Sequence, residues 1–494
     1  MNYQKTNNIL GFLCGAIATV TYVLTMEPTI SWWDTGEFIA AAHRMQIVHQ
    51  PGAPLFLMIQ QLFASLAAGN VEHVAYWMNF GSALASGFTI VFLFWTITAF
   101  VRKLVHKSGV GSERAQLVQI MGAGFVGAMA YAFTDSFWFS AVESEVYALS
   151  SLCTAVVFWA ILKWEARADE PGSDRWLVFI AYIMGLSIGV HLLNLLTIPV
   201  LALVVYFRRA NQVTVGGVAK ALLIGCIILA VILWGIIQYL VKFAAYTDLF
   251  FVNTLGLGFG TGGAVFAVLL IGGIAYGIWY AVRKAKPVLH IALVCLGFII
   301  FGYGSFAMVL IRANANPSLN NSAPDDMFSF LWYLNRGQFG SEPLIKGPYF
   351  ESQVIDIERG ANEYYKGEET YEVAGTTDRA IYDRTTFFPR IYSDRDNRPF
   401  AYRLWLGLGE GERPQFIDNL RFFSTYQLGH MYWRYFMWNF AGRQNDMEAR
   451  FAGPTTGNWI SGIKPVDQWR LGGQDALPRA VQSDPSHNTY YFLP

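Results

Sequence analysis

Long apolar runs separated by short polar segments fill residues 1–311, whereas residues 312–494 are polar and rich in Asp, Arg, Tyr and Gly. A helix that crosses the hydrocarbon core of a membrane needs about 20 apolar residues. Nine runs approach this length and predict nine transmembrane helices, at residues 9–26, 76–100, 116–133, 147–163, 176–191, 192–207, 218–240, 262–282 and 288–311. The pattern therefore predicts an all-α polytopic membrane domain over 1–311 and a soluble domain over 312–494.

The fifth and sixth predicted helices come from one nearly continuous apolar stretch. We divide this stretch because polar and helix-breaking residues interrupt it, namely Gly185, Gly189, His191, Asn194 and Pro199. Without the division, residues 176–207 would form a single helix of 32 residues, which is longer than a membrane requires.

A further apolar run at residues 53–69 is excluded as a span by the distribution of basic residues. Loops on the cytoplasmic side of membrane proteins carry an excess of Lys and Arg. With nine spans and a cytoplasmic N-terminus, fourteen basic residues before residue 312 lie inside and two, Arg44 and Lys242, lie outside. Counting 53–69 as a span would place the basic segment 102–114 outside. We therefore place 53–69 at the outer surface and 312–494 outside the cytoplasm.

The composition agrees with a membrane protein and excludes other classes. Apolar residues make up 54% of the chain and charged residues 14%, against roughly 25% charged in a soluble domain. The 35 basic and 35 acidic residues balance, and no basic tract predicts a nucleic-acid partner. The four cysteines lie in apolar runs, so neither a disulfide framework in 312–494 nor a CxxC metal site is predicted.

The N-terminal apolar run lacks a small-residue cleavage site and is followed by further spans, so it predicts an anchor and not a cleaved signal peptide. We expect an integral protein of a bacterial inner membrane. Its N-terminus is predicted to be cytoplasmic and its C-terminal segment periplasmic.

The densest group of candidate functional residues follows the first span, at residues 31–38 (Ser-Trp-Trp-Asp-Thr-Gly-Glu-Phe). Asp34 and Glu37 are three residues apart and share a face if this stretch is helical. One interpretation is a helix start, with Asp34 as N-cap and Glu37 completing a variant of the capping box. The other is a general base at the membrane edge, made more basic where the two flanking tryptophans exclude water. Spacing alone does not separate them.

Two further polar groups lie in predicted outer loops. Glu143 and Glu145 precede the fourth span and would diverge on one helix, so we expect only one of them to face the Asp34 region. The alternative is a pair of solvated acids in an interfacial aromatic belt. His191 and Asn194 could point into one cavity, or they could form hydrogen bonds between helices.

The remaining patterns predict structure more than chemistry. Residues 258–263 formally match GxGxxG, but no strand precedes them and they open a predicted span, which argues against a dinucleotide site. Residues 328–335 predict a short helix. Residues 348–403 alternate Tyr-rich stretches with Gly and Asp, which predicts small strands and turns. The extracytoplasmic segment is therefore expected to have an α+β fold.

A multi-span chain with an acidic first outer loop resembles the GT-C glycosyltransferases. More specifically, residues 33–38 (Trp-Asp-Thr-Gly-Glu-Phe) and 49–55 (His-Gln-Pro-Gly-Ala-Pro-Leu) resemble the family labelled domain of unknown function 2723. That family includes protein O-mannosyltransferase-like membrane proteins. Supporting similarities lie at residues 79–83, 143–149 and 185–195, so the resemblance extends over about residues 9–200.

The resemblance implies a transferase that moves a sugar, mannose or another hexose, from a polyprenyl-phosphate carrier to Ser or Thr hydroxyls of exported proteins. By analogy, Asp34 is the base that deprotonates the acceptor as the sugar inverts, and Glu37 and Glu145 position acceptor or sugar. Charge and location add candidates for binding substrate or the carrier phosphate. The full set is Asp34 and Glu37 as catalytic residues, with Glu143, Glu145, His49, Arg44, His191 and Asn194 for substrate binding.

Cofactors and partners follow from the same resemblance. The expected partners are the lipid-linked sugar donor, an exported acceptor protein and membrane lipid. A divalent metal could assist by bridging phosphate, and the acids at positions 34, 37, 143 and 145 could hold one, but their spacing does not require it and no metal ligand is assigned.

Two departures from the family pattern stand out. The usual motif resembles His-Pro-Pro-Gly, whereas this chain has Gln50 at the second position, which places the rigid turn in question. Relatives often continue into further spans, so the chain is expected to be truncated or divided after residue 494.

Three other functions are open to the sequence. A related transferase could decorate a lipid or surface polysaccharide, since the same donor chemistry serves any hydroxyl. A transporter is disfavoured because the spans hold few mid-membrane charges and no convincing repeat. A structural subunit of an export complex would require no particular role for Asp34.

Overall fold

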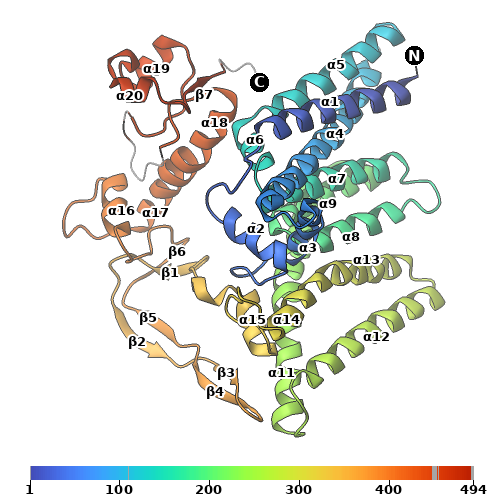
Figure 1. Cartoon of the computed structure of the whole chain (residues 1–494), viewed down its shortest axis with the longest axis vertical. Helices are drawn as coiled ribbons and strands as arrows, with labels where there is room; N and C mark the ends of the chain where they lie inside the picture. Colours follow the sequence, from blue (N-terminus) through green and yellow to red (C-terminus); the bar gives the residue numbers. More distant parts are fainter. Residues whose placement is uncertain (1, 109–110, 448–452, 454, 491–494) are drawn as a thin grey trace. The chain divides into compact units, whose positions relative to one another are not determined.

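The computed structural model describes residues 2–108, 111–447, 453 and 455–490 of the chain. The chain divides into two compact units, which are described separately (Figure 1). Unit 1 comprises Met1–Phe133, Phe137–Phe339 and Tyr364–Glu372, and unit 2 comprises Thr134–Ser136, Gly340–Glu363 and Val373–Pro494. The main division therefore falls after residue 339, and not at 311 as the hydropathy pattern predicts, because the first polar residues after the last span fold onto unit 1.

Unit 1 is an all-α membrane domain, as predicted. Among the described residues, eight helical segments are long and apolar enough to cross a membrane: Tyr3–Thr25, Val71–Lys107, Glu113–Ala132, Val146–Ala166, Leu192–Arg209, Val215–Asn253, Thr261–Arg283 and Pro287–Asn314. The fifth predicted span, 176–191, forms helix α8 (Arg175–Ile188), whose 14 residues are shorter than the length that spans a bilayer. The run at 53–69 forms the short helix α3 (Pro54–Ala64) and one further turn.

The spanning segments carry the labels of Figure 1, with these bounds: α1 (Tyr3–Thr25), α4 (Val74–Ser108), α5 (Glu113–Ala132), α7 (Val146–Ala166), α9 (Ile198–Arg209), α10 (Val215–Ala230), α11 (Leu240–Asn253), α12 (Thr261–Arg283), α13 (Pro287–Tyr303) and α14 (Ala307–Asn314). A π-helical stretch, Val231–Tyr239, joins α10 to α11. Helix α1 packs along α4 and α5, and α8 packs along α7 and α13 (Figure 1). These pairings bury the apolar clusters that hold unit 1 together.

The break predicted between residues 176 and 207 is confirmed. Helix α8 ends at Ile188, a 3-10 turn covers Leu192–Thr197, and α9 begins at Ile198 with Pro199 in its first turn. Proline fits there because the first helical residues have no intrahelical acceptor for an N–H.

Two glycines let α8 and α13 approach within backbone contact. A Cβ added at Gly302 would lie 2.4 Å from the backbone of Gly185, and one added at Gly185 would lie 2.6 Å from the carbonyl oxygen of Ile299. Small residues at helix interfaces allow such close packing in membrane proteins.

We expect Gly302→Ala to lower the melting temperature of the purified protein, because the added methyl group forces α8 and α13 apart. Gly297→Ala is the matched control on the same helix, since its Cβ would meet only a side-chain carbon at 3.6 Å. That control should be neutral or stabilising, as alanine is the better helix former. Equal melting temperatures for the two variants would contradict the close packing.

The Gly-rich run 258–263 surrounds a carboxylate of the chain itself. Asp248 is fully buried, and its side chain accepts hydrogen bonds from the backbone N–H groups of Gly260, Gly262 and Gly263. The hydroxyl of Tyr371 donates to the same carboxylate at 2.7 Å. These amides are occupied by Asp248, which agrees with the rejection of a dinucleotide site.

Unit 2 has the α+β character predicted for the C-terminal segment. Strand β1 (Lys346–Pro348) pairs antiparallel with β6 (Thr385–Phe387), and β2 (Val354–Glu358) pairs antiparallel with β5 (Arg379–Tyr382). Strand β7 (Gly442–Arg443) pairs with β8 (Asn488–Thr489). Strand β3 (Asn362–Lys366) pairs with β4 (Tyr371–Thr376), and the adjoining ends of these two strands, within Tyr364–Glu372, belong to unit 1. The helices of unit 2 are α16 (Arg398–Leu406), α17 (Phe416–Phe422), α18 (Arg434–Phe440), α19 (Lys464–Leu471) and α20 (Arg479–Gln482).

Four short helices lie outside the spans, and the candidate site is built on the first of them and on the loops beside them. Helix α2 (Thr35–Arg44) and α3 pack on each other through Phe38 and Phe56, whose rings meet edge to face. Helix α6 (Asp135–Ala141) is followed by a bend that leads into α7. The predicted helix at 328–335 is α15 (Met327–Leu334), which also belongs to unit 1.

Candidate functional site

Asp34 stands at the start of α2, but its side chain does not cap the helix. It occupies the N-cap position without a side-chain hydrogen bond to the backbone, so the capping-box interpretation is wrong. The flanking tryptophans do not cover it either: Trp32 and Trp33 are exposed, and the Asp34 side chain remains 57% exposed. The carboxylate is therefore open to a substrate.

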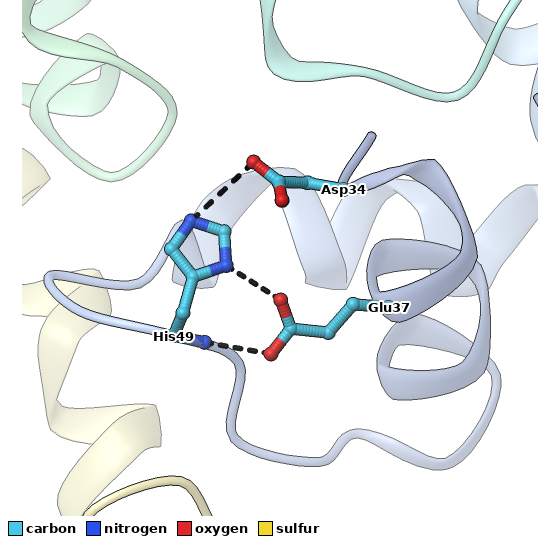
Figure 2. A group of neighbouring side chains, drawn as sticks. All are labelled: Asp34, Glu37 and His49. Carbon is cyan, nitrogen blue, oxygen red and sulfur yellow. Dashed lines mark hydrogen bonds and ion pairs between the residues drawn. The ribbon is translucent and has the colours of Figure 1, made fainter. Parts of the chain in front are cut away.

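His49 lies between the carboxylates of Asp34 and Glu37 (Figure 2). Its Nδ1 is 2.5 Å from Oε2 of Glu37, and its backbone N–H donates to Oε1 of Glu37 at 2.9 Å. Its Nε2 faces Oδ2 of Asp34 at 3.8 Å. The two acids thus share a face of the chain, as their spacing predicts, and His49 connects them.

The loop after α2 brings His49 back to the start of the helix. Met45 adopts a left-handed conformation that ends α2 and reverses the chain. The backbone N–H of Gly52 then donates to the carbonyl of His49, which closes the turn. Gly52 has φ of 77°, and a Cβ there would lie 2.5 Å from the hydroxyl oxygen of Tyr333, so this position requires glycine.

The hydrogen bond that the His49 ring donates to Glu37 raises the pKa of His49; partial burial opposes this rise, and the negative charges of Glu37, Asp34 and Glu145 add to it. Imidazole therefore takes up a proton more readily here than in water. When the imidazole of His49 is protonated, its charge lies against the two carboxylates of Glu37 and Asp34.

We expect the contribution of His49 to stability to depend on pH. Because its pKa is raised in the folded state, this contribution is fully present below the ordinary pKa of histidine and is lost as pH rises through the raised value. The melting temperature of wild type should therefore exceed that of His49→Gln by more at pH 6 than at pH 9. A difference that stays constant over this range would show that the imidazolium does not pair with Glu37.

Glu145 and Glu143 are both buried next to the same region. Glu145 caps α7, where its Oε2 accepts the N–H of Val146 at 2.7 Å. Burial raises the pKa of Glu145 to about 7; the Val146 hydrogen bond opposes the rise, and the charges of Asp34 and Glu143 add to it. Burial likewise raises the pKa of Glu143, opposed by a hydrogen bond with Ser31.

Two predictions about this acidic pair are wrong. The acids are not solvated, since Glu143 is 4% exposed and Glu145 is 7% exposed. They also do not diverge on one helix, because residues 142–144 form a bend and Glu145 is extended, which lets both acids approach the segment 31–37.

The other predicted residues lie farther from Asp34 or have structural partners. Asn194 is fully buried and forms hydrogen bonds with Ser187 and Thr154. For Asn194 the structure therefore favours hydrogen bonding between helices over a position in a cavity. His191 precedes the 3-10 turn and packs its ring on Tyr147 at 5.3 Å. Arg44 ends the ten-residue helix α2 and so lies about 15 Å along the axis from Asp34. The structure does not bring Arg44 to the carboxylates.

The side chains of Asp34, Glu37 and His49 could together hold a divalent cation. One ligand atom from each of Asp34, Glu37 and His49 lies within 4.8 Å of the others. Carboxylate oxygen and imidazole nitrogen suit several divalent metals. In the present arrangement Nδ1 of His49 bonds to Glu37, so a metal that used this atom would replace that hydrogen bond.

Residues 333–338, which no sequence motif connects to the site, hold the His49 loop in place. The hydroxyl of Tyr333 donates to the carbonyl of Val48 at 2.6 Å. Gln50 is buried, donates to Ser322, and accepts the backbone N–H of Gln338 at 3.0 Å. Gln50 stands where the family pattern has proline, and its two hydrogen bonds hold the turn after His49 in place of that rigid residue. The hydrogen-bond partners of Gln50 are about 270–290 residues away in sequence, so no local pattern could reveal them.

Comparison with known proteins supports an O-mannosyltransferase-like GT-C protein. Residues 34–214 match the profile of the protein O-mannosyl-transferase TMEM260 N-terminal domain. This description differs from domain of unknown function 2723, and that narrower label is not confirmed. Residues 340–424 match a family of unknown function, DUF8416.

Two curated relatives share the same region. The chain is 24% identical over 182 residues to protein O-mannosyl-transferase tmem260 of Dictyostelium discoideum, covering 36% of this chain and 20% of the relative. It is 25% identical over 183 residues to protein O-mannosyl-transferase TMEM260 of Mus musculus, covering 36% of this chain and 23% of the relative. The chain thus spans about a fifth of the length of these relatives. No solved structure matches it significantly.

Proposed function

We propose that this chain is a membrane glycosyltransferase that transfers mannose, or another hexose, from a polyprenyl-phosphate carrier to Ser or Thr hydroxyls of exported proteins. One observation carries the proposal: Asp34 is an exposed carboxylate outside the spans, held beside His49, within the region similar to an O-mannosyl-transferase domain. Other supporting features are the spanning helices of unit 1 and the acidic pair at the start of α7.

Asp34 has the exposure and chemistry of a general base for a hydroxyl acceptor. In the proposed step, the acceptor hydroxyl donates its proton to the Asp34 carboxylate as its oxygen attacks the anomeric carbon of the sugar. The bond from that carbon to the carrier phosphate breaks, and the phosphate oxygen leaves with the electron pair. Attack opposite the leaving group inverts the anomeric carbon.

His49 and Glu37 act on Asp34 without touching the reacting atoms. Glu37 accepts the Nδ1 proton of His49 and so directs Nε2 toward Asp34. This arrangement holds the Nε2 side of the His49 ring beside the base. We therefore assign Glu37 and His49 as positioning residues and Asp34 as the catalytic residue.

The distribution of basic residues supports a position of Asp34 on the non-cytoplasmic side of the membrane. A polyprenyl-phosphate sugar presented on that leaflet would reach acceptors as they are exported. The two curated relatives come from eukaryotes, so the proposal concerns this face of the membrane and not a bacterial inner membrane in particular.

The proposal is tested by reconstituting the purified chain in vesicles with radiolabelled polyprenyl-phosphate mannose and a Ser/Thr-rich peptide. We expect label on the peptide, and none when nucleotide-linked mannose replaces the lipid donor. Label that appears only on lipid or polysaccharide would support the second acceptor class. If neither a peptide nor a lipid acceptor receives sugar from any polyprenyl-phosphate donor, the proposed function is wrong.

A further inference from the structure

An exposed group of apolar side chains lies on a long helical segment of unit 2. Helix α17, a π-helical stretch (Phe423–Trp433) and α18 follow one another without a break over residues 416–440 (Figure 1). The ring of Phe436 stacks on those of Tyr432 and Trp433, with centroids 6.2 Å and 5.6 Å apart. Helical spacing places two further exposed residues on the same side. The patch, hereafter the aromatic face, consists of Leu428, Met431, Tyr432, Trp433 and Phe436.

The charged residue within 428–440 points into unit 2 instead of toward water. Arg434 is 3% exposed, and its guanidinium donates hydrogen bonds to the carbonyl oxygens of Thr456 and Gly457. His430 is buried as well. A surface helix normally turns its charged residues to the solvent and its apolar residues to the core. Because the arrangement here is the opposite, the aromatic face is suited to a partner that is less polar than water.

The C-terminal end of this helical segment is tied to a loop that leaves a membrane span. Span α5 ends at Ala132, and residues 134–136, which follow it, belong to unit 2. The backbone N–H of Ser136 donates to Oδ1 of Asn439 at 2.8 Å, and Nδ2 of Asn439 donates to Oγ of Ser136 at 3.1 Å. These two hydrogen bonds hold the last turn of α18 beside the loop.

Asp135 adds a second group of contacts in the same loop. Its carboxylate accepts hydrogen bonds from Nδ2 of Asn488 at 2.9 Å and from the hydroxyl of Tyr490 at 2.7 Å. The same carboxylate lies 3.6 Å from the guanidinium of Arg443, which follows shortly after the end of α18. Two groups of polar contacts therefore fix this end of the helical segment to the loop after α5.

These contacts limit how far the aromatic face can lie from the membrane. The chain from Ala132 to Ser136 spans at most about 14 Å when fully extended. Phe436 precedes Asn439 by one helical turn, which is about 5 Å along the axis. With the reach of the Asn439 side chain, Phe436 lies within about 25 Å of the end of α5 in any orientation of unit 2. The headgroup layer begins where the apolar part of a span ends, so it is within reach of the aromatic face.

We propose that the aromatic face lies in the headgroup layer of the membrane that unit 1 spans and attaches unit 2 to the lipid surface. Tyr and Trp are enriched in this layer because their rings are apolar while their O–H and N–H groups reach water. A helix with an apolar exposed face binds at the boundary between headgroups and acyl chains. The covalent link from α5 keeps this surface close to the helix. The attachment is independent of the donor and the acceptor in the proposed function.

A fluorescent label read in nanodiscs tests this position. The full chain first has its four cysteines, at positions 14, 153, 226 and 295, replaced by alanine. Trp433→Cys then carries a polarity-sensitive dye on the aromatic face. We expect phosphatidylcholine with bromine near the top of its acyl chains to quench this label at least about 2-fold more than a control label, because such a face inserts to about 5–10 Å. Iodide in the water phase should quench it less than the control.

Trp469→Cys is the matched control, because it replaces another exposed tryptophan of unit 2. Trp469 is 86% exposed on α19, and two exposed charged residues, Lys464 and Asp475, flank it in sequence. Its label should respond to iodide and hardly to the brominated lipid. Phe436→Cys should repeat the result of Trp433→Cys. The melting temperature of each labelled variant, compared with that of the cysteine-free parent, reports whether the fold is intact.

The pattern of quenching decides between lipid and protein as the partner. Stronger quenching by brominated lipid at 433 and 436 than at 469 would support the attachment, whether or not the chain transfers sugar. Equal quenching at the three positions would overturn it. Labels at 433 and 436 that are shielded from both quenchers would also overturn it, because protein would then cover the aromatic face. A nanodisc mass that corresponds to two chains would identify that protein as a second copy.

Discussion

Asp34→Asn should abolish measurable sugar transfer while the variant accumulates in the membrane at the level of wild type. Removal of a general base typically costs a factor of about 100 to 10,000 in rate. Folding should be unaffected because Asp34 makes no capping hydrogen bond that asparagine would have to replace, and its side chain is more than half exposed. The measurement is the rate of label transfer to peptide in vesicles, with membrane abundance determined in parallel.

The matched control is Glu72→Gln, which removes an exposed carboxylate from the turn before α4. It should transfer sugar at the rate of wild type. Glu37→Gln should give an intermediate loss, because the amide still contacts His49 but no longer carries the charge that favours imidazolium. Full activity of Asp34→Asn would exclude Asp34 as the base and favour a structural role for this region.

Glu145→Gln should change how stability depends on pH. The folded-state pKa of Glu145 is raised from 4.5 to about 7, so the protein loses stability as pH rises from the unfolded-state value through 7, and the loss then levels off. A displacement of this size corresponds to about 3 kcal/mol. The glutamine side chain can still accept the N–H of Val146 but does not ionise, so the variant escapes this loss.

We therefore expect the melting temperature of Glu145→Gln, relative to wild type, to increase between pH 5 and pH 8 by roughly several degrees. Glu72→Gln serves again as control, since its carboxylate is exposed. If Glu145→Gln and wild type differ by the same amount at both pH values, Glu145 is not buried in the folded protein as the structure has it.

Hydropathy and charge alone determined the membrane architecture and the most prominent carboxylate. Apolar runs of spanning length locate the helices because no other structure satisfies backbone hydrogen bonds inside a bilayer. The break after Ile188 was predicted for the same local reason, from glycine, proline and polar residues within an apolar stretch. Asp34 and Glu37 could be selected because their spacing places them on one helical face.

Tertiary structure decided which groups surround Asp34 and what state they are in. A capping box and a free carboxylate have the same local sequence, and only the fold shows that Asp34 caps nothing while Glu37 binds His49. The boundary between the units likewise depends on α15 folding back onto the His49 loop. The contacts that hold the His49 loop likewise come from Tyr333 and Gln338, which bond to Val48 and Gln50 across 285 and 288 residues of sequence. Such contacts arise from packing between distant segments, which neither spacing nor composition encodes locally.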